Sequence, residues 1–595
     1  MNNENRIQKQ LDFLYGKETS EKIWIKLNAL LQSVKTEYSV LSDRKYKISE
    51  KDIVIITYSD QFWEVKTAPL QSLNKFLHGH LLGVINSVHI LPFFPYSSDD
   101  GFSVIDFKQV DPELGNWHDI QKLAHSFRLM VDLVINHVSR QSDWFQKFLR
   151  GEKKYEDFFI TVAPDKDLSK VVRPRALPLL TEVETYAGKK YVWTTFSTDQ
   201  IDLNYQNPEV LIAIINVLLH YVTHGAKIIR LDAIAYLWKE IGTSCIHLPQ
   251  THAVVKLLRA ILDEVAPGVI LISETNVPHQ ENVSYFGAYF EDNKQRGDEA
   301  QLVYQFPLAP LVLHTFYSSD VTVLREWARD LSTPFPQSHF FNFIASHDGI
   351  GIRPAEGLLS PDQINELVDS TLQHGGQVSY RSNPDGTKSV YELNITVYDA
   401  LNDPKHPRAD IDLQRFLASQ VIILSLAGIP GVYVHSLFGS SNCDHCVTET
   451  GRLRSINREK FDLKKLVKAL NNPASRKAQV FDSYRKLLRI RSNHHAFHPQ
   501  GEQRIHNLGK NIFGITRVAP DKSEYILCLV NISDTTMHYS LHLPAARVVE
   551  APVWVDLIGG GEIHTEKDRL PIMLRPYQYA WLVPINGPRD SKIIG

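Results

Sequence analysis

Short apolar runs recur along the middle of the chain, and longer amphipathic stretches separate them. The runs are rich in Val and Ile, which is typical of buried β-strands. We count eight of them: Ile53–Thr57, Val88–Leu91, Leu129–Ile135, Lys227–Leu231, Val269–Ile272, Leu302–Tyr304, Phe340–Ala345 and Val421–Leu426. Almost continuously apolar strands that alternate with helices are typical of a parallel sheet covered on both faces. Eight repeats predict an α/β fold, a closed (β/α)8 TIM barrel, with an open doubly wound sheet as the structural alternative.

The first 50 residues have a different pattern. Apolar residues such as Leu11, Leu14 and Leu27 recur there at helical spacing among Lys and Glu. This spacing predicts two or three amphipathic helices, which form an N-terminal extension over residues 1–50. The barrel domain is then expected over residues 51–497.

Two spacings within the barrel region are too long for simple loops between strands and helices. We interpret them as an inserted subdomain at about 138–207 and a second long loop at about 350–411, because loops of that size are usually functional. After residue 497 apolar and polar residues alternate, as in Asn511–Val518 and Glu524–Asn531. Alternation of this kind predicts a C-terminal antiparallel β domain over 498–595.

The composition is that of an ordinary globular protein and excludes several classes of partner. Of the 595 residues 43 % are apolar and 22 % charged, and the net charge is −3. No excess of basic charge favours nucleic acid, so none is expected as a partner. The longest apolar stretch, Val421–Val434, is shorter than the roughly 20 residues that span a bilayer, and the first residues do not resemble an export signal. We therefore expect no membrane association.

The cysteines bear on compartment and on metal binding. The chain has four of them, Cys245, Cys443, Cys446 and Cys528, which are too few for a disulfide framework and favour a cytoplasmic location. Cys443 and Cys446 flank His445, but no second pair of ligands follows at a suitable spacing. These residues are interpreted as loop residues, and no metal is predicted.

Polar side chains that could carry chemistry follow four of the apolar runs. In chain order they are Asp132 with Asn136 and His137, Arg230 with Asp232, Glu274, and His347 with Asp348. Catalytic groups of a (β/α)8 barrel project from the carboxyl ends of its strands. Glycoside chemistry needs one carboxylate at the anomeric carbon and a second carboxyl that donates a proton. Arg230 lies two residues before Asp232, on the same strand face, and can keep that carboxylate ionised.

With these motifs in order, the chain resembles glycoside hydrolase family 13, the α-amylase family, and within it the sucrose-phosphorylase-like branch. The resemblance extends from about Ile53 to Arg458. Finer matches occur at His89–Phe94, Asp99–Phe102, Arg173–Arg175, Gly242–Cys245 and His347–Gly351. The resemblance implies a TIM barrel that acts on α-glucosides and needs neither metal nor cofactor.

The resemblance also implies roles for individual residues. Asp232 would be the nucleophile that forms a β-glucosyl-enzyme, Glu274 the general acid and then base, and Asp348 the group that binds the 2- and 3-hydroxyls of the glucosyl ring. The residues implied to bind the sugar are Asp99, Phe102, His137, Arg230, His347 and Arg454. Those implied to bind phosphate or the acceptor are Arg175, Tyr236, Tyr391 and Glu392.

The acceptor side indicates which substrate is favoured. Sucrose phosphorylases carry Asp-Leu-Tyr-Gln in their second long loop, whereas this chain has Ser389-Val390-Tyr391-Glu392. The N-terminal helices and the loop that follows Arg173 resemble glucosylglycerate phosphorylases of the same branch instead. Glycerate carries a carboxylate, so we expect a cation in the acceptor pocket, with Arg175, Lys239 and Lys388 as candidates.

The resemblance thus implies a retaining α-glucoside phosphorylase that takes a small α-glucoside and inorganic phosphate to α-glucose 1-phosphate. The alternatives are sucrose or sucrose 6'-phosphate as donor, and a hydrolase or transglycosylase of the same family. A non-catalytic sugar-binding barrel is a further alternative, but it predicts lost acids, whereas Asp232, Glu274 and Asp348 are all present. The sequence leaves room for a homo-oligomer.

Overall fold

A closed barrel of parallel strands forms the centre of the molecule. In this computed structural model, residues 2–37, 47–175, 177–289, 296–383 and 387–585 are described. Around the barrel the strand order is β1-β16-β12-β11-β10-β9-β4-β3. The bounds are β1 Val54–Thr57, β3 Ser87–Ile90, β4 Arg128–Val134, β9 Ala226–Asp232, β10 Ile270–Ser273, β11 Leu302–Tyr304, β12 His339–Asn342 and β16 Ile429–Tyr433. The predicted TIM barrel is therefore confirmed, and the open sheet is excluded.

Seven predicted runs fall on barrel strands, but the eighth prediction was wrong. Val421–Leu426 lies almost wholly in helix α13 (Ala409–Ser425), and the eighth strand is β16. The C-terminal half of α13 is buried all round, and such a helix cannot be told from a buried strand by its apolar pattern. The true strand was missed because Pro430 and Gly431 argue against a central strand. Gly431 is needed there, since a Cβ atom would lie 2.4 Å from the Phe341 ring.

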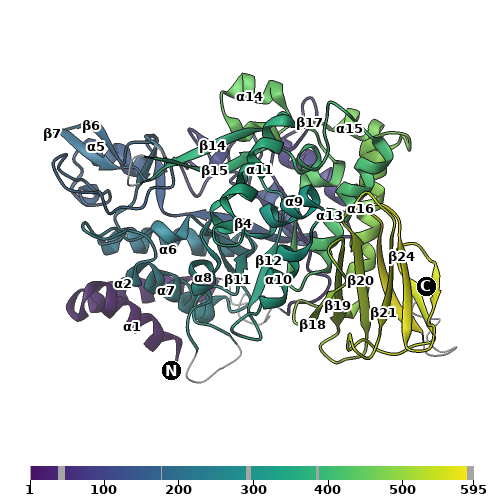
Figure 1. Cartoon of the computed structure of the whole chain (residues 1–595). Coiled ribbons are helices and arrows are strands. Elements are labelled where there is room, and N and C mark those ends of the chain that lie inside the picture. The colour runs from purple at the N-terminus through teal and green to yellow at the C-terminus, as the bar shows by residue number, and fades with distance from the viewer. Residues whose placement is uncertain (1, 38–46, 176, 290–295, 384–386, 586–595) are drawn as a thin grey trace.

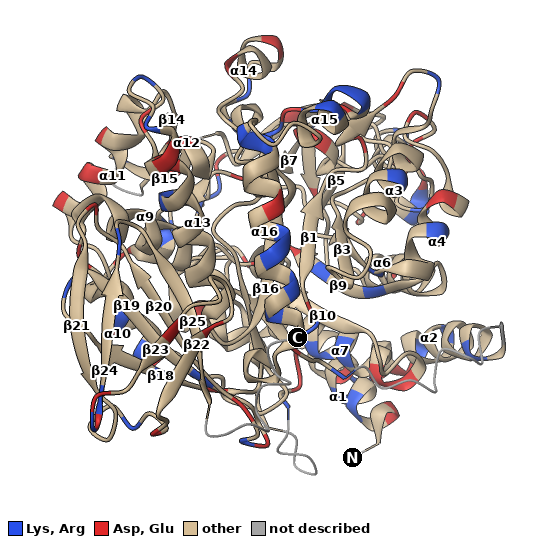
Figure 2. Ribbon diagram, turned by 90° about the vertical axis from the view of Figure 1, so that its right-hand side faces the viewer, with Lys and Arg blue, Asp and Glu red and all other residues tan. Residues whose placement is uncertain are grey.

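Helices surround the barrel, and two of them lie N-terminal to it. The described α-helices not yet mentioned are α1 Asn3–Tyr15, α2 Lys17–Glu37, α3 Pro69–His80, α4 Trp117–Ser126, α5 Asp143–Leu149, α6 Pro208–Thr223, α7 Pro249–Val265, α8 His279–Val283, α9 Leu308–Ser318, α10 Thr322–Asp330, α11 Pro361–Gln373, α12 Val397–Leu401, α14 Asp444–Thr450, α15 Leu463–Leu470 and α16 Arg476–Asn493. None of these helices combines the length and apolar character needed to cross a bilayer. Figure 2 shows mainly basic residues along α16, with one acidic residue among them.

The N-terminal helices pack on the outside of the barrel. Helix α1 contacts α7, and α2 contacts α6 and α7, as Figure 1 shows at its lower left. Arg6 forms an ion pair with Asp263 of α7 at 2.7 Å, and the Tyr15 hydroxyl donates to the Tyr205 carbonyl at 2.9 Å. The two predicted helices are present, whereas residues 38–46 of the predicted extension lie outside the described residues. The boundaries of the extension, barrel and C-terminal domain stay predictions.

Both long insertions contain small β-structures. The first holds β5 (His137–Ser139) paired with β8 (Gln200–Asp202) and the hairpin of β6 (Leu180–Thr185) with β7 (Gly188–Trp193). In the second, β15 (Lys388–Asn394) lies between β13 (Ile350–Gly351) and β14 (Gln377–Ser382). Residues 176 and 384–386 of these insertions lie outside the described residues. Figure 1 places β6–β7, β14–β15 and α14 along the upper side of the molecule, opposite α1 and α2.

The C-terminal part of the chain forms the predicted antiparallel β domain. Its six-stranded sheet has the order β18-β19-β20-β25-β22-β23, and β21 pairs with β24. The bounds are β18 Glu502–Asn507, β19 Ile512–Val518, β20 Tyr525–Asn531, β21 Met537–His542, β22 Val553–Asp556, β23 Glu562–His564, β24 Arg569–Leu574 and β25 Tyr579–Ile585. The domain is joined to the barrel through α13, where Trp581 Nε1 donates to Ser425 Oγ at 3.0 Å. A short parallel pair, β2 (Phe62–Trp63) with β17 (Phe461–Asp462), completes the strands.

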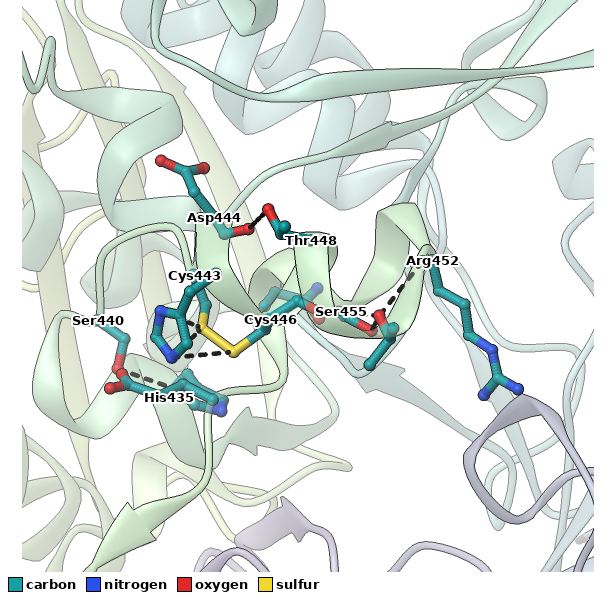
Figure 3. The surroundings of a disulfide bond; sticks show 12 residues. His435, Ser440, Cys443, Asp444, Cys446, Thr448, Arg452 and Ser455 are labelled. Atoms are coloured by element: carbon teal, nitrogen blue, oxygen red, sulfur yellow. Dashed lines mark hydrogen bonds between the residues drawn. A yellow bond between two sulfur atoms is a disulfide. The ribbon is translucent and has the colours of Figure 1, made fainter.

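A disulfide bond joins two of the cysteines, which the sequence pattern indicates only as loop residues. Cys443 and Cys446 are bonded to each other at the start of α14 (Figure 3). Counting cysteines tests for a framework of bridges and misses a local pair whose Cα atoms lie only 5.3 Å apart. The cysteine part of the argument for a cytoplasmic location is weakened accordingly. The Cys443, Cys446 and His445 ligand atoms lie within 4.8 Å of one another, so the absence of a metal stays a prediction.

Candidate active site

The three predicted acids lie at the carboxyl ends of barrel strands. Asp232 ends β9, Glu274 follows β10 directly, and Asp348 follows β12. Arg230 on β9 joins the first two: its Nη1 lies 2.6 Å from Asp232 Oδ1, and its Nη2 lies 3.7 Å from Glu274 Oε2. Both carboxyl groups are thus within 4 Å of one buried guanidinium. The structure therefore brings Asp232 and Glu274 together, as the sequence predicted.

Arg230 has a third partner deeper in the barrel. Asp132 of β4 accepts from Arg230 Nη1 through Oδ1 and from His89 Nε2 through Oδ2, the latter at 2.7 Å. Burial raises the pKa of Asp132, but His89 and Arg230 outweigh it and leave the pKa below its ordinary value. Asp132 therefore stays ionised and holds one side of the guanidinium. Because Arg230 shares one positive charge among Asp132, Asp232 and Glu274, it cannot fully compensate a negative charge on each of them.

As a consequence, the pKa of both Asp232 and Glu274 is raised. Burial, together with the charges of Asp232 and Asp348, raises the pKa of Glu274 to about 7, although Arg230 opposes this. Burial also raises the pKa of Asp232, and neighbouring Asp132 adds to the effect. Glu274 is the group that holds a proton near neutral pH, which is the property of a general acid.

The backbone helps to position Glu274. Its Oε2 accepts from the Ala233 N–H at 2.9 Å. Ala233 has φ of 48°, in the left-handed region that residues with a side chain seldom adopt. This turn directly follows Asp232, so the strained residue couples the orientation of the two carboxyl groups.

Asp348 is held from another direction. Arg454, on the 3-10 turn Leu453–Asn457, places Nη1 2.5 Å from Asp348 Oδ1, and its Nε donates to Glu392 Oε2 at 3.0 Å. Burial raises the pKa of Asp348, but Arg454 and His347 lower it well below its ordinary range. Asp348 is therefore ionised. The structure thus brings together three predicted residues from separate segments of the chain: Asp348, Glu392 and Arg454.

Neutral side chains cover the barrel opening near Asp348. Phe102 stacks on His347 with ring centres 4.8 Å apart and planes 6° apart, and the Phe102 carbonyl lies 2.9 Å from His137 Nε2. Burial lowers the pKa of His347 to about 3 and also lowers the pKa of His137. Both imidazoles are therefore neutral. Gln200, which sequence reasoning missed, lies 3.1 Å from His137 Nε2 and 3.4 Å from Asp99 Oδ2.

Arg175 and Asp99 form the outer edge of the site. Arg175 Nη2 lies 3.3 Å from Asp99 Oδ2, and its guanidinium lies over the Phe196 ring at 5.8 Å. Phe196 in turn packs edge-on against Tyr236 at 5.5 Å. Above these groups lies a cavity of about 530 Å³ whose lining includes Asp99, Arg175, Tyr391, Glu392 and Arg454. Three of the four predicted phosphate and acceptor residues, Arg175, Tyr391 and Glu392, therefore line this cavity, whereas Tyr236 does not.

Lys239 corrects one prediction about the acceptor pocket. This lysine is only 5 % exposed, and its Nζ lies 2.7 Å from Asn136 Oδ1 and 2.6 Å from Asp202 Oδ2. It joins the end of β4 to β8 of the first insertion and does not face the cavity. Lys388 lies at the exposed start of β15. Of the three cations named as candidates, only Arg175 lines the cavity.

Comparisons with known proteins agree with this geometry. Residues 78–349 match the family model described as "Alpha amylase, catalytic domain". The chain is 47 % identical over 591 residues to a glucosylglycerate phosphorylase of Spirochaeta thermophila, with 98 % of each chain covered. It is 51 % identical over 536 residues to one of Allomeiothermus silvanus, with 90 % of this chain and 91 % of the relative covered.

A solved structure of a more distant relative is also similar. The crystal structure of sucrose 6F-phosphate phosphorylase from Thermoanaerobacter thermosaccharolyticum superposes with a TM-score of 0.70 at 29 % identity. The superposition covers 81 % of this chain and 94 % of that chain. The two chains thus share one architecture over most of their length.

The contacts of Lys239 lead to a prediction about stability. Replacing Lys239 by Ala leaves the Asp202 carboxylate buried without its cation, so we expect the free energy of unfolding to fall by about 3–5 kcal/mol. The exposed Lys388→Ala serves as the matched control and should change it by less than about 0.5 kcal/mol. Denaturant unfolding of both variants is the measurement. Equal stability of the two would show that the Lys239 contacts do not stabilise the insertion.

Proposed function

This chain belongs to the α-amylase family, in the group of its glucosylglycerate phosphorylases, and we propose on that premise that it exchanges glycerate for phosphate on an α-glucosyl group. The substrates would be glucosylglycerate and inorganic phosphate, and the products α-glucose 1-phosphate and glycerate. The observation that carries the proposal is the placement of Asp232 and Glu274 on one guanidinium, with Glu274 protonated near neutral pH.

The first step breaks the bond between the glucosyl carbon and the glycerate oxygen. Asp232 attacks the anomeric carbon while Glu274 gives its proton to the departing oxygen, so that a β-glucosyl-enzyme and glycerate form. Arg230 supports this step because it stabilises the ionised form of Asp232. Once Glu274 has lost its proton it becomes the base of the second step. A phosphate oxygen then attacks from the side that glycerate left, and the second inversion restores the α configuration.

The glucosyl ring would be held by the groups around Asp348. The ionised Asp348 accepts hydrogen bonds from the 2- and 3-hydroxyls, and the neutral imidazole of His347 donates to a sugar oxygen. His137, whose Nε2 N–H donates to the Phe102 carbonyl, would contact the sugar without donating to it. Asp99 and Arg454 would bind the 4-hydroxyl end, and Phe102 would support the ring face. The contacts of Phe102 with both the His347 ring and the His137 imidazole favour this arrangement.

Phosphate would enter along the wall that Arg175 forms. A guanidinium binds a phosphate through two parallel hydrogen bonds, and Arg175 lies at the cavity with Tyr236 close by. Tyr391 lies on the same side, where burial raises its pKa and keeps its hydroxyl protonated as a donor. Glu392 would act indirectly, since its carboxylate is paired with Arg454.

Two further properties complete the proposal. We place the enzyme in the cytoplasm. The sequence leaves room for a homo-oligomer, and light scattering on the purified protein measures the oligomeric state. Neither metal nor cofactor has a step in this reaction. Sucrose or sucrose 6'-phosphate as donor, and water or a sugar hydroxyl as acceptor, are the alternatives that the experiment below separates.

The direct test is the dependence of donor cleavage on phosphate. We expect glucosylglycerate to be cleaved to α-glucose 1-phosphate only when phosphate is present, at a rate that exceeds cleavage of sucrose and sucrose 6'-phosphate. Product analysis with and without phosphate provides the measurement. Release of free glucose at the same rate without phosphate would show a hydrolase instead.

The raised pKa of Glu274 gives a pH prediction with a defined sign. A general acid acts in its protonated form, so kcat/KM for glucosylglycerate should fall about tenfold per pH unit above about pH 7, while the decrease on the acid side follows protonation of the nucleophile Asp232. α-Glucosyl fluoride is the matched control, because fluoride leaves without a proton and its kcat/KM should not show the decrease on the alkaline side. Identical pH profiles for the two donors would contradict the role of Glu274.

A further inference from the structure

The arginines that line the cavity are already paired with carboxylates: Arg454 with Asp348 and Glu392, and Arg452 and Arg458 with Asp100. Lys239 is buried between Asn136 and Asp202, Lys388 lies at an exposed strand end, and Arg175 is paired with Asp99. With the proposed function as the premise, another positive group is required near the leaving group. Two arginines from the second insertion, Arg353 and Arg381, act on Tyr236, and Glu274 acts on the same tyrosine.

Arg353 reaches the site because its loop packs against the segment that follows Glu274. It lies five residues after Asp348 and two after Gly351 of strand β13. A Cβ atom on Gly351 would lie 2.7 Å from the amide of Asn276, which is two residues after Glu274. The Ile352 N–H donates to the Tyr391 carbonyl at 3.1 Å, so the same segment is also bonded to the wall of the cavity.

Tyr236 connects the arginines to the reacting groups. The Arg353 side chain hydrogen-bonds to Tyr236, and the charges of both Arg353 and Arg381 act on it, as does that of Glu274. Burial raises the pKa of Tyr236 to about 12, which keeps its hydroxyl protonated. Tyr236 thus lies between the general acid and two guanidinium groups. A leaving group that has taken its proton from Glu274 and moves toward Tyr236 would meet positive charge.

The existing partners of these arginines leave capacity for an anion. Arg353 Nη2 lies 3.6 Å from Glu281 Oε2, which also accepts from His247, and Glu281 is 43 % exposed. Arg381 Nη2 lies 2.8 Å from Glu356 Oε1, but its buried Nε has no hydrogen-bond partner among the described residues. The Arg353 side chain is 14 % exposed, so it is accessible without being free in solvent.

We propose that Arg353, supported by Arg381, binds the carboxylate of the glycerate leaving group and so determines the preference for an acidic acceptor. A guanidinium and a carboxylate form paired hydrogen bonds of fixed geometry, which a neutral acceptor such as glycerol cannot make. Phosphate, which enters after glycerate has left, would be bound by Arg175, which lies over Phe196, the ring that packs against Tyr236. The two anions are therefore recognised by different arginines.

The test compares two acceptors in the reverse reaction with α-glucose 1-phosphate as donor. For Arg353→Gln we expect kcat/KM for D-glycerate to fall roughly 10- to 100-fold, mainly through KM. The value for glycerol, which is glycerate without its carboxylate, should stay within about twofold. Arg353→Lys keeps the charge but not the paired geometry and should lie between these values. Arg150→Gln is the matched control, because Arg150 belongs to an exposed ion pair with Glu152, and it should leave the values for both acceptors unchanged.

Three outcomes would overturn the inference. An equal loss of kcat/KM for glycerate and glycerol shows a structural role for Arg353. Unchanged kcat/KM values for both acceptors show that Arg353 has no role in acceptor binding. In the forward reaction, a rise in KM for phosphate equal to or larger than that for glycerate assigns Arg353 to phosphate. A wild-type enzyme that does not use glycerate refutes the proposed function, whereas a wild type that does, with an unchanged ratio in Arg353→Gln, refutes only this inference. Arg353→Lys supplies the comparison if Arg353→Gln does not fold.

Discussion

The site depends on one buried guanidinium. Arg230 lies among three carboxyl groups, those of Asp132, Asp232 and Glu274, at the end of the barrel. Burying so many acidic groups together is unfavourable unless a cation compensates them, and removing one partner of such a group is strongly destabilising. Because a single positive charge is shared, the pKa of both Asp232 and Glu274 is raised, and that of Glu274 reaches about 7. The acid and base required for glycoside chemistry arise from this imbalance.

The segments that follow the barrel strands supply most of the positive charge of the site. The acids come from barrel strands, whereas Arg175, Arg353 and Arg454 come from segments that the strands carry outward. Lys239 belongs to the same scheme, since it joins the end of β4 to β8 and so positions the loop that leads to Arg175. An acidic barrel opening covered by basic loops is suited to a reaction in which both the leaving group and the attacking group are anions. Neutral His137 and His347 remain for the uncharged sugar.

Much of this arrangement could be predicted from the sequence, because strand periodicity and residues at strand ends are local signals. Seven barrel strands and the convergence of Asp232 and Glu274 followed from them. The eighth strand did not, since Pro430 and Gly431 conceal it and the buried half of α13 resembles a strand. The partners of Lys239 and the position of Arg353 depend on how distant loops pack. No local pattern encodes such contacts. The disulfide between Cys443 and Cys446 is local, and it was missed because the argument against disulfides rested on the number of cysteines and not on their spacing.

The covalent intermediate on Asp232 tests the account most directly. In Glu274→Gln, α-glucosyl fluoride should still form the glucosyl-enzyme, because fluoride needs no proton, but the missing base should slow its removal. Peptide mass spectrometry after rapid denaturation should then find one hexose on the peptide that contains Asp232. Consumption of the donor with no hexose attached, or a hexose attached to another residue, would contradict the account.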